Sequence, residues 1–347
     1  MKTLLVTGGA GFIGSNFIMY MLDKHSDYRI INIDVLTYAG NPDNLRSVEG
    51  NPNYEFIRAD IADKNAVESV FRSSDIDYVV NFAAESHVDR SILSPEVFIK
   101  TNIFGTLNLL NISKNHWFRN GKFPECKKFI QISTDEVYGS LSDTGYFSEE
   151  TPLDPHSPYS ASKAGADLIV KSFFDTYKMP INITRCSNNY GPYQFPEKLI
   201  PLVIANALRK KDIPVYGDGL NVRDWLYVSD HCRAIEMVMQ SGRVGEVYNI
   251  GGHNEKTNLS IIKYIISYLH DNVDSTITPE LIKFVEDRKG HDRRYAVDYT
   301  KISNELGWHP ATSFEEGLRL TIEWYLDNSQ WIENIYSGEY HRCYKTV

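Results

Sequence analysis

Short apolar runs alternate with amphipathic segments over the first half of the chain. The runs at 3–7, 29–34, 54–60, 77–84, 127–133 and 181–186 are rich in β-branched residues and predict strands. The first is apolar throughout, which is typical of a strand covered on both faces. Most runs are separated by segments with helical spacing, such as Phe17, Ile18 and Met21. This alternation predicts βαβ units and a parallel sheet with helices on both sides.

The alternation breaks after Asn188, where loops rich in Pro, Gly and aromatic residues begin. Strands are expected again at 224–230 and 246–252, and an amphipathic helix is expected near Leu318 and Ile322. We therefore predict an α/β protein with a Rossmann-type doubly wound sheet, formed by residues 1–189 and about 223–250. The remaining residues, about 190–222 and 251–347, are expected to form a smaller, partly interleaved α/β domain that binds substrate.

Composition and charge narrow the class of protein. The chain has 347 residues and a formal net charge of −9, which argues against nucleic-acid binding. Its four cysteines show neither CxxC nor clustered His/Cys spacing, so no metal site or disulfide framework is expected. No apolar run suffices to span a bilayer, and no signal-peptide pattern precedes the first strand. We expect a cytoplasmic protein with no membrane partner.

The stretch TGGAGFIG follows the first predicted strand and opens a helix. Its glycines, including Gly8, Gly11 and Gly14, allow a tight turn and a close approach of the backbone to a pyrophosphate. Asp34 ends the next strand, where a carboxylate accepts hydrogen bonds from the adenosine ribose and repels a 2′-phosphate. The pattern predicts a dinucleotide site that prefers NAD to NADP.

Polar or small residues also follow the other predicted strands, whose carboxyl ends share the ligand-binding edge of the sheet. The residues expected to contact NAD are Gly8, Gly11, Phe12, Ile13, Gly14, Asp34, Thr37, Asp60, Ile61, Ala83, Ala84, Thr101, Tyr159, Lys163 and Asn189.

Tyr159 and Lys163 share one face of a helix that Ser157 and Pro158 open. We expect the ammonium to lower the pKa of the phenol, so that the phenol can take a proton from a sugar hydroxyl. A YxxxK match arises about once by chance in such a chain. It gains weight because it follows the glycine loop and the stretch IST at 132–134.

Two adjacent acids, Asp135 and Glu136, follow Thr134. A Tyr-Lys couple needs no further carboxyl group to oxidise an alcohol, but two carboxyl groups in opposite protonation states can run acid and base steps together. The alternative is a structural role in a solvated turn or as a helix N-cap.

Together these motifs resemble the extended short-chain dehydrogenase/reductase family, whose members mostly modify nucleotide sugars. Within it, the stretches AAESHVDRS, STDEVYG, SPYSASK, CSNNYGPYQFPEKLIPL, RDWLYV and GHDRRYA are similar to those of the 4,6-dehydratases. The resemblance implies conversion of dTDP-glucose to dTDP-4-keto-6-deoxyglucose and water. Bound NAD would oxidise C4, water would leave across C5 and C6, and the hydride would return to C6.

The resemblance also implies roles for single residues. Tyr159 and Lys163 would act in the oxidation, Thr134 would polarise the C4 ketone, Glu136 would remove the C5 proton, and Asp135 would protonate the leaving hydroxyl. The implied substrate contacts are Ser86, Thr134, Asn188, Glu197, Lys198, Leu199, Pro214, Tyr216, Arg223, Asn258, Arg288, His291 and Tyr295. The implied oligomer is a homodimer, in which helices near 95–115 and 158–178 pair into a four-helix bundle.

Several alternatives stay open. A UDP- or GDP-sugar could undergo the same reaction. A nucleotide-sugar 4-epimerase or decarboxylase expels no water and leaves Asp135 and Glu136 without a task, while a protein that only senses NAD(H) needs no intact Tyr-Lys pair. Two departures from the family pattern, Lys289 in place of a Pro and a short segment between Gly139 and Ser157, leave open how the site is covered.

Overall fold

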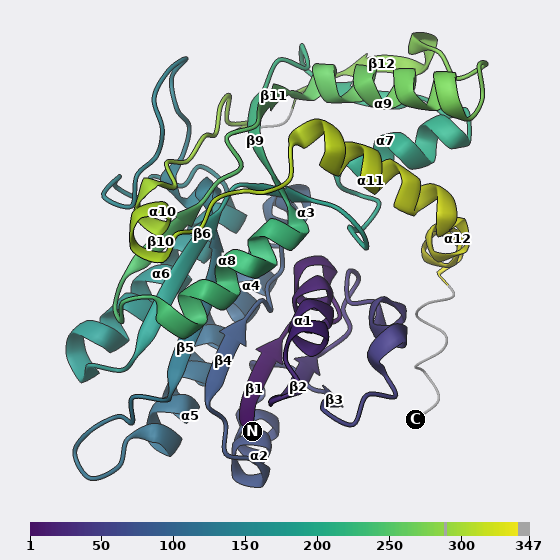
Figure 1. The fold of residues 1–347 in the computed structure, drawn as a ribbon. Helices are drawn as coiled ribbons and strands as arrows, with labels where there is room; N and C mark the ends of the chain where they lie inside the picture. The colour runs from purple at the N-terminus through teal and green to yellow at the C-terminus, as the bar shows by residue number, and fades with distance from the viewer. Residues whose placement is uncertain (288–289, 339–347) are drawn as a thin grey trace.

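The computed structural model describes residues 1–287 and 290–338. Within them, seven parallel strands form one sheet in the order β10-β6-β5-β4-β1-β2-β3 (Figure 1). The predicted doubly wound parallel sheet is confirmed. The strands are β1 (Lys2–Thr7), β2 (Tyr28–Asp34), β3 (Tyr54–Arg58), β4 (Tyr78–Asn81), β5 (Lys128–Thr134), β6 (Ile181–Cys186) and β10 (Val247–Ile250).

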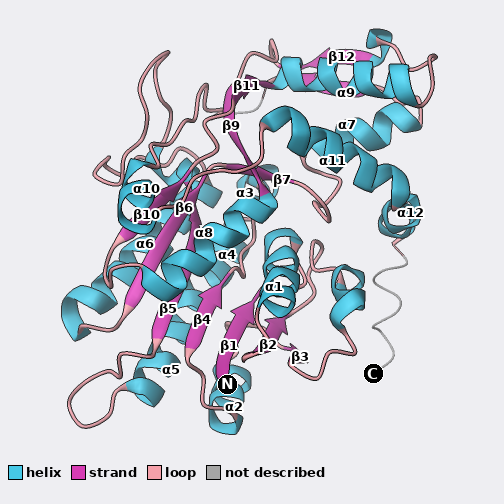
Figure 2. Cartoon of the chain, viewed as in Figure 1, coloured by secondary structure: helices cyan, strands magenta, loops and turns pink. Residues whose placement is uncertain are grey.

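Helices cover both faces of this sheet (Figure 2). Side chains alternate along a strand, so Leu4 of β1 packs with Phe17 on one face while Leu5 packs with Val67 on the other. The helical elements of this part are α1 (Phe12–Lys24), η1 (Pro42–Val48), α2 (Lys64–Ser73), α3 (Val88–Leu93), α4 (Pro95–Phe98), η2 (Ile99–Gly105), α5 (Thr106–Trp117), η3 (Asp135–Tyr138), α6 (Pro158–Tyr177) and α8 (Val228–Ser241).

A second set of elements lies beyond the end of the sheet toward which the strands point (Figure 1). Its own core contains Ile204, Ile262 and Leu318. The elements are β7 (Asn188–Tyr190), α7 (Leu199–Leu208), β8 (Ile213–Tyr216), β9 (Val222–Tyr227), β11 (Glu255–Thr257), α9 (Asn258–Asn272), η4 (Pro279–Leu281), β12 (Ile282–Val285), α11 (Phe314–Asp327) and α12 (Ser329–Ser337); α10 (Thr300–Leu306) packs near β10 instead.

The predicted strand at 224–230 differs from the structure in extent and in partners. β9 ends at Tyr227, and helix α8 starts at the next residue. β9 pairs with β7 and β11 in a small sheet and not with the seven-stranded one. The chain therefore leaves the seven-stranded sheet after β6. It returns to that sheet with α8, which packs on it, and with β10, which is one of its strands. No described helix has the length and apolarity needed to cross a membrane.

Candidate active site

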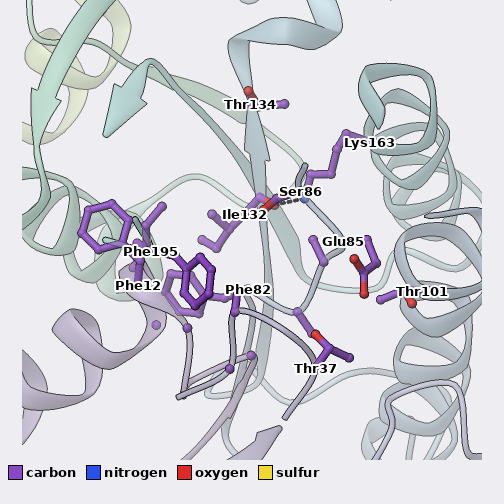
Figure 3. A pocket seen from close by; sticks show the side chains of 18 of the residues that line it. Phe12, Thr37, Phe82, Glu85, Ser86, Thr101, Ile132, Thr134, Lys163 and Phe195 are labelled. Carbon is purple, nitrogen blue, oxygen red and sulfur yellow. Dashed lines mark hydrogen bonds between the residues drawn. The ribbon is translucent and has the colours of Figure 1, made fainter. Parts of the chain in front are cut away.

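A cleft of about 450 Å³ opens at the carboxyl ends of β1, β2, β4, β5 and β6 (Figure 3). Every residue predicted to contact NAD lines it, and so do all five predicted catalytic residues. Residues separated by up to about 180 positions in the sequence therefore meet here, because the ends of parallel strands share one edge. Their individual roles remain predictions.

The glycine loop closely approaches β4, the neighbour of β1. Gly8 has φ +70°, and a Cβ on it would lie only 2.6 Å from the nitrogen of Ala83. A Cβ on Gly14 would lie 2.5 Å from the carbonyl oxygen of Gly8, so helix α1 could not start this close to the loop with any other residue. The N-terminus of α1 is thereby placed in the cleft wall, where its N–H groups suit a pyrophosphate.

Asp34 lies at the end of β2 and is almost fully buried. Its Oδ2 accepts a hydrogen bond from the N–H of Ala10 (3.0 Å), and its Oδ1 accepts one from the N–H of Leu36 (2.8 Å). Burial raises the pKa of this carboxyl group, and the two backbone N–H groups lower it. The contacts fix the carboxylate at the cleft edge with one lone pair left on each oxygen. With the close-packed glycine loop, this arrangement fits the adenosine and pyrophosphate of NAD.

Helix α6 presents Tyr159 and Lys163 from its first two turns. A reciprocal cap fixes its start, because the Oγ of Ser157 accepts from the N–H of Ser160 (3.1 Å) and the Oγ of Ser160 accepts from the N–H of Ser157 (3.0 Å). The Nζ of Lys163 donates to the carbonyl of Ile132 in β5 at 2.6 Å. Burial lowers the pKa of Lys163, while the charge of Asp167 raises it.

The expected lowering of the Tyr159 pKa is wrong for this structure. Burial of the phenol, followed by the negative charge of Glu136, raises its pKa well above the ordinary value. The sequence reveals the lysine one turn away but not how completely the ring is desolvated, and desolvation is the larger effect here. A phenolate at this position therefore depends on additional positive charge close to the ring.

Asp135 and Glu136 start η3, directly after β5, and lie in different surroundings. Asp135 is 1% exposed, its Oδ1 accepts from the Oγ1 of Thr134 (3.3 Å), and its Oδ2 has no hydrogen-bond partner among the described residues. Burial and the charge of Glu136 raise the pKa of Asp135 well above the ordinary value. Glu136 is half-buried, and its N–H donates to the Oγ1 of Thr134 (3.3 Å). The N-cap of η3 is therefore Thr134 and neither of the two acids. Asp135 is also too buried to belong to a solvated turn, which was the alternative structural role.

A family model described as GDP-mannose 4,6 dehydratase matches residues 5–321. The chain belongs to this family.

Relatives of this dehydratase family match almost the full chain. A dTDP-glucose 4,6-dehydratase from Xanthomonas campestris pv. campestris is 50% identical over 347 residues, which cover 98% of this chain and 97% of the relative. The crystal structure of dTDP-glucose 4,6-dehydratase from Bacillus anthracis in complex with NAD is 50% identical with a TM-score of 0.87, covering 96% of this chain and 100% of that one. The crystal structure of a dTDP-glucose 4,6-dehydratase from Streptomyces venezuelae with NAD bound is 45% identical with a TM-score of 0.88, covering 96% of this chain and 99% of that one.

The substrate contacts predicted for this dehydratase family member fall into two groups. Ser86, Thr134, Asn188, Glu197 and Lys198 line the cleft. The others do not line it and lie on the second set of elements or in the loop after β12: Leu199, Pro214, Tyr216, Arg223, Asn258, His291 and Tyr295. Arg288, like Lys289, lies outside the described residues.

Arg223 is held by the loop after β12 and is not presented to the cleft. Its guanidinium donates to the carbonyl oxygens of Val222 (2.8 Å) and Asp292 (2.9 Å) and lies over the ring of Tyr295 at 4.3 Å. These carbonyl oxygens use only some of the five N–H donors of the guanidinium, so the contact between Arg223 and a diphosphate stays a prediction. The charge of Arg223 still acts on Asp135, whose pKa it lowers.

Sequence reasoning missed several cleft residues, including Tyr38, Gln194 and Phe195. Glu85 lines the cleft as well, as expected for a polar residue that follows Ala84 at the end of a strand. Tyr38, Gln194 and Phe195 come from loops whose paths no periodicity predicts. Within the described ranges, no group of three or more His, Cys, Asp or Glu side chains has the geometry of a metal site.

Proposed function

We propose that this chain converts dTDP-glucose into dTDP-4-keto-6-deoxyglucose and water, with NAD held in the cleft. The observation that carries this function is the buried Asp135 beside Glu136, in the same cleft as Tyr159 and Lys163. The relatives named dTDP-glucose 4,6-dehydratase, 45% to 50% identical over nearly the whole chain, support the same substrate.

NAD fits the residues of the cleft. Gly8 and Gly14 leave room for the pyrophosphate, and Asp34 suits an adenosine ribose that carries no 2′-phosphate. When bound, NAD accepts a hydride from C4 of the sugar and later returns it to C6. Because the reaction has no net redox change, each turnover regenerates NAD in the cleft. The cofactor can therefore stay bound between turnovers.

Tyr159 is proposed to accept the proton of the C4 hydroxyl at its Oη. Lys163, one helical turn further along α6, is proposed to supply part of the positive charge that the phenolate needs. Burial acts against that phenolate. Thr134 is proposed to turn its Oγ1–H from the Oδ1 of Asp135 to O4 of the sugar, which polarises the ketone as it forms.

Asp135 and Glu136 are proposed to expel water. The C4 ketone acidifies the proton on C5, which Glu136 accepts, while Asp135 gives its own proton to the departing C6 hydroxyl. Asp135 suits the acid role because burial and the Glu136 charge raise its pKa and keep it protonated. Glu136, being half-buried, is the carboxylate better suited to act as base.

A GDP-linked sugar is the second candidate substrate, favoured by the description of the family model, GDP-mannose 4,6 dehydratase. The same five catalytic side chains would act, since they address the hexose and not the base. A 4-epimerase is less well supported, because that reaction leaves Asp135 without a leaving group to protonate.

The test is incubation of the purified protein with dTDP-glucose, UDP-glucose and GDP-mannose in parallel, followed by the alkali-induced absorbance of 4-keto-6-deoxy sugars. We expect product from dTDP-glucose. Product from GDP-mannose alone would replace the substrate and keep the chemistry. A C4-epimerised product from any of the three, without the 4-keto-6-deoxy sugar, would contradict the proposed reaction.

The two-domain division is a proposal supported by the separate core around Ile204 and Leu318. Since β9 belongs to the small sheet, we place the return to the NAD-binding domain at Val228, the start of α8. The second domain is proposed to hold the nucleotide. The contacts implied by resemblance to the family are Leu199, Pro214, Tyr216, Arg223, Asn258, Arg288, His291 and Tyr295.

We propose a homodimer through the face formed by α4, η2 and α6. Large apolar side chains are exposed on these neighbouring helices, among them Phe104 (53% exposed) and Leu168 (61% exposed). Pairing this face with its copy would cover them in a four-helix arrangement. A cytoplasmic location is proposed as well, because Cys126 and Cys186 are free thiols, which suits a reducing compartment.

A further inference from the structure

The cleft is crossed by residues 194–198, here called the strap, which belong to the second set of elements. Its first residue is fixed there, because the carbonyl of Gln194 accepts a hydrogen bond from the Oη of Tyr325 in α11 (2.6 Å). Its last residue, Lys198, is the N-cap of α7. Between them, Phe195 and Glu197 line the cleft, and Figure 3 shows Phe195 on the side where Phe12 and Phe82 lie.

The strap is attached on one side to the loop that follows β2. The Oη of Tyr38 donates to the Oε1 of Glu197 at 3.0 Å. The rings of Tyr38 and Phe195 meet edge to face with centroids 5.7 Å apart. The guanidinium of Arg90 lies 4.0 Å from the centroid of the Tyr38 ring, so the ring is held by a second partner as well.

On the other side the strap is attached to the loop that follows β4. The Nζ of Lys198 donates to the carbonyl of Ser86 at 3.1 Å, and the Nε2 of His87 lies 3.5 Å from the Oε2 of Glu197. In the sheet, β1 lies between β4 and β2. The strap is therefore fastened to the loops on both sides of the glycine loop that follows β1.

We propose that the strap encloses the pyrophosphate of bound NAD against the glycine loop, and that the hydrogen bond from Tyr38 to Glu197 must break before NAD leaves. Tyr38 is then a positioning residue that sets how long the cofactor is retained. The inference rests on the proposed function, since slow release of NAD is compatible with rapid turnover only when the reaction regenerates NAD in the cleft.

The chemistry of Tyr38 supports this role. Burial and the charge of Glu197 raise its pKa, so the phenol stays protonated and remains a donor to the carboxylate. A largely buried hydrogen bond from a neutral donor to a charged acceptor is stronger than one between two neutral groups. It joins the loop after β2 to the strap.

The test is the rate at which bound NAD exchanges with isotopically labelled NAD in the intact protein. Tyr38→Phe keeps the ring and its contacts with Phe195 and Arg90 but removes the donor. We expect release about tenfold faster, the effect of losing one charge-assisted hydrogen bond. Tyr268→Phe is the matched control. Tyr268 donates a hydrogen bond to Glu323 that is also 3.0 Å long, but this pair lies outside the cleft. The control variant should therefore release NAD at the unaltered rate.

Unchanged NAD exchange in a folded Tyr38→Phe variant would overturn the proposal. Should this variant not fold, Lys198→Met removes the attachment on the other side at a partly exposed side chain, and the same two outcomes decide the question. The exchange needs no nucleotide sugar. Loss of the proposed function would appear as failure to convert dTDP-glucose while NAD exchange still responds to Tyr38, so the two failures are distinguishable.

Discussion

Asp135 and Glu136 are neighbours in sequence and yet differ in the solvent and charges around them. The Asp135 side chain is buried, and one of its carboxyl oxygens has no hydrogen-bond partner in the part of the chain that the structure describes. Glu136 is half-buried at the cleft wall. One negative charge next to another disfavours a second ionisation, so the more buried group is the one that keeps its proton. This asymmetry supports the proposed roles of Asp135 as the acid and Glu136 as the base.

Replacing the base separates the two halves of the reaction. Glu136→Gln removes the acceptor of the C5 proton but leaves Tyr159 and Lys163 in place. We expect oxidation at C4, seen as NADH absorbance after dTDP-glucose is added, with water loss slowed at least about 100-fold. The exposed Glu125→Gln is the control and should behave as the unaltered protein does. Normal water loss in Glu136→Gln would show that another group is the base.

The raised pKa of Asp135 predicts a pH dependence with a definite sign. An acid acts only while protonated, so water loss should slow as the pH rises through the raised pKa of Asp135, and below it this group should impose no limit. Asp135→Asn, which cannot donate in this way, should be slow at every pH and lack the alkaline decline. The check is kcat against pH for both proteins, and an identical alkaline decline in Asp135→Asn would contradict the assignment.

At the scale of elements, helix α6 matters because its first turns carry both Tyr159 and Lys163. Ser157→Ala removes the side-chain half of the cap and should lower the free energy of unfolding by about 1 kcal/mol. It should also lower kcat about tenfold, since a loosened first turn misplaces Tyr159. Ser313→Ala removes the corresponding cap of α11 and should lower stability alone. Urea unfolding and turnover measure both, and equal kcat in the two variants would contradict the positioning role.

Elements also explain how much of the site could be predicted from sequence. Most residues predicted to contact NAD directly follow strands. Because the carboxyl ends of parallel strands meet at one edge of the sheet, these residues can be placed together without knowing the paths of the loops. The substrate side is built from loops, so nothing in the periodicity of the sequence brings Tyr38 to Glu197 or ties Arg223 to the carbonyl of Asp292. The pKa of Tyr159 was mispredicted for a related reason, because a spacing gives the neighbour but not the degree of burial.

At the scale of the whole molecule, the exposed apolar face on α4, η2 and α6 should control assembly. Leu168→Asp combined with Phe104→Asp places two charges in the proposed interface and should convert the dimer to a monomer in analytical ultracentrifugation. Val273→Asp replaces an exposed apolar residue on the distant α9 end and should leave the dimer intact. A double variant that still sediments as the unaltered protein would place the interface elsewhere, and a monomeric unaltered protein would refute the dimer.

The central claim is that one hydride leaves C4 and returns to C6 of the same sugar while Asp135 and Glu136 remove water between the two transfers. The most direct measurement uses dTDP-glucose with deuterium at C4 and locates the label in the product by NMR. We expect deuterium at C6 and a solvent-derived hydrogen at C5. Deuterium lost to solvent, with only ordinary hydrogen at C6, would contradict it.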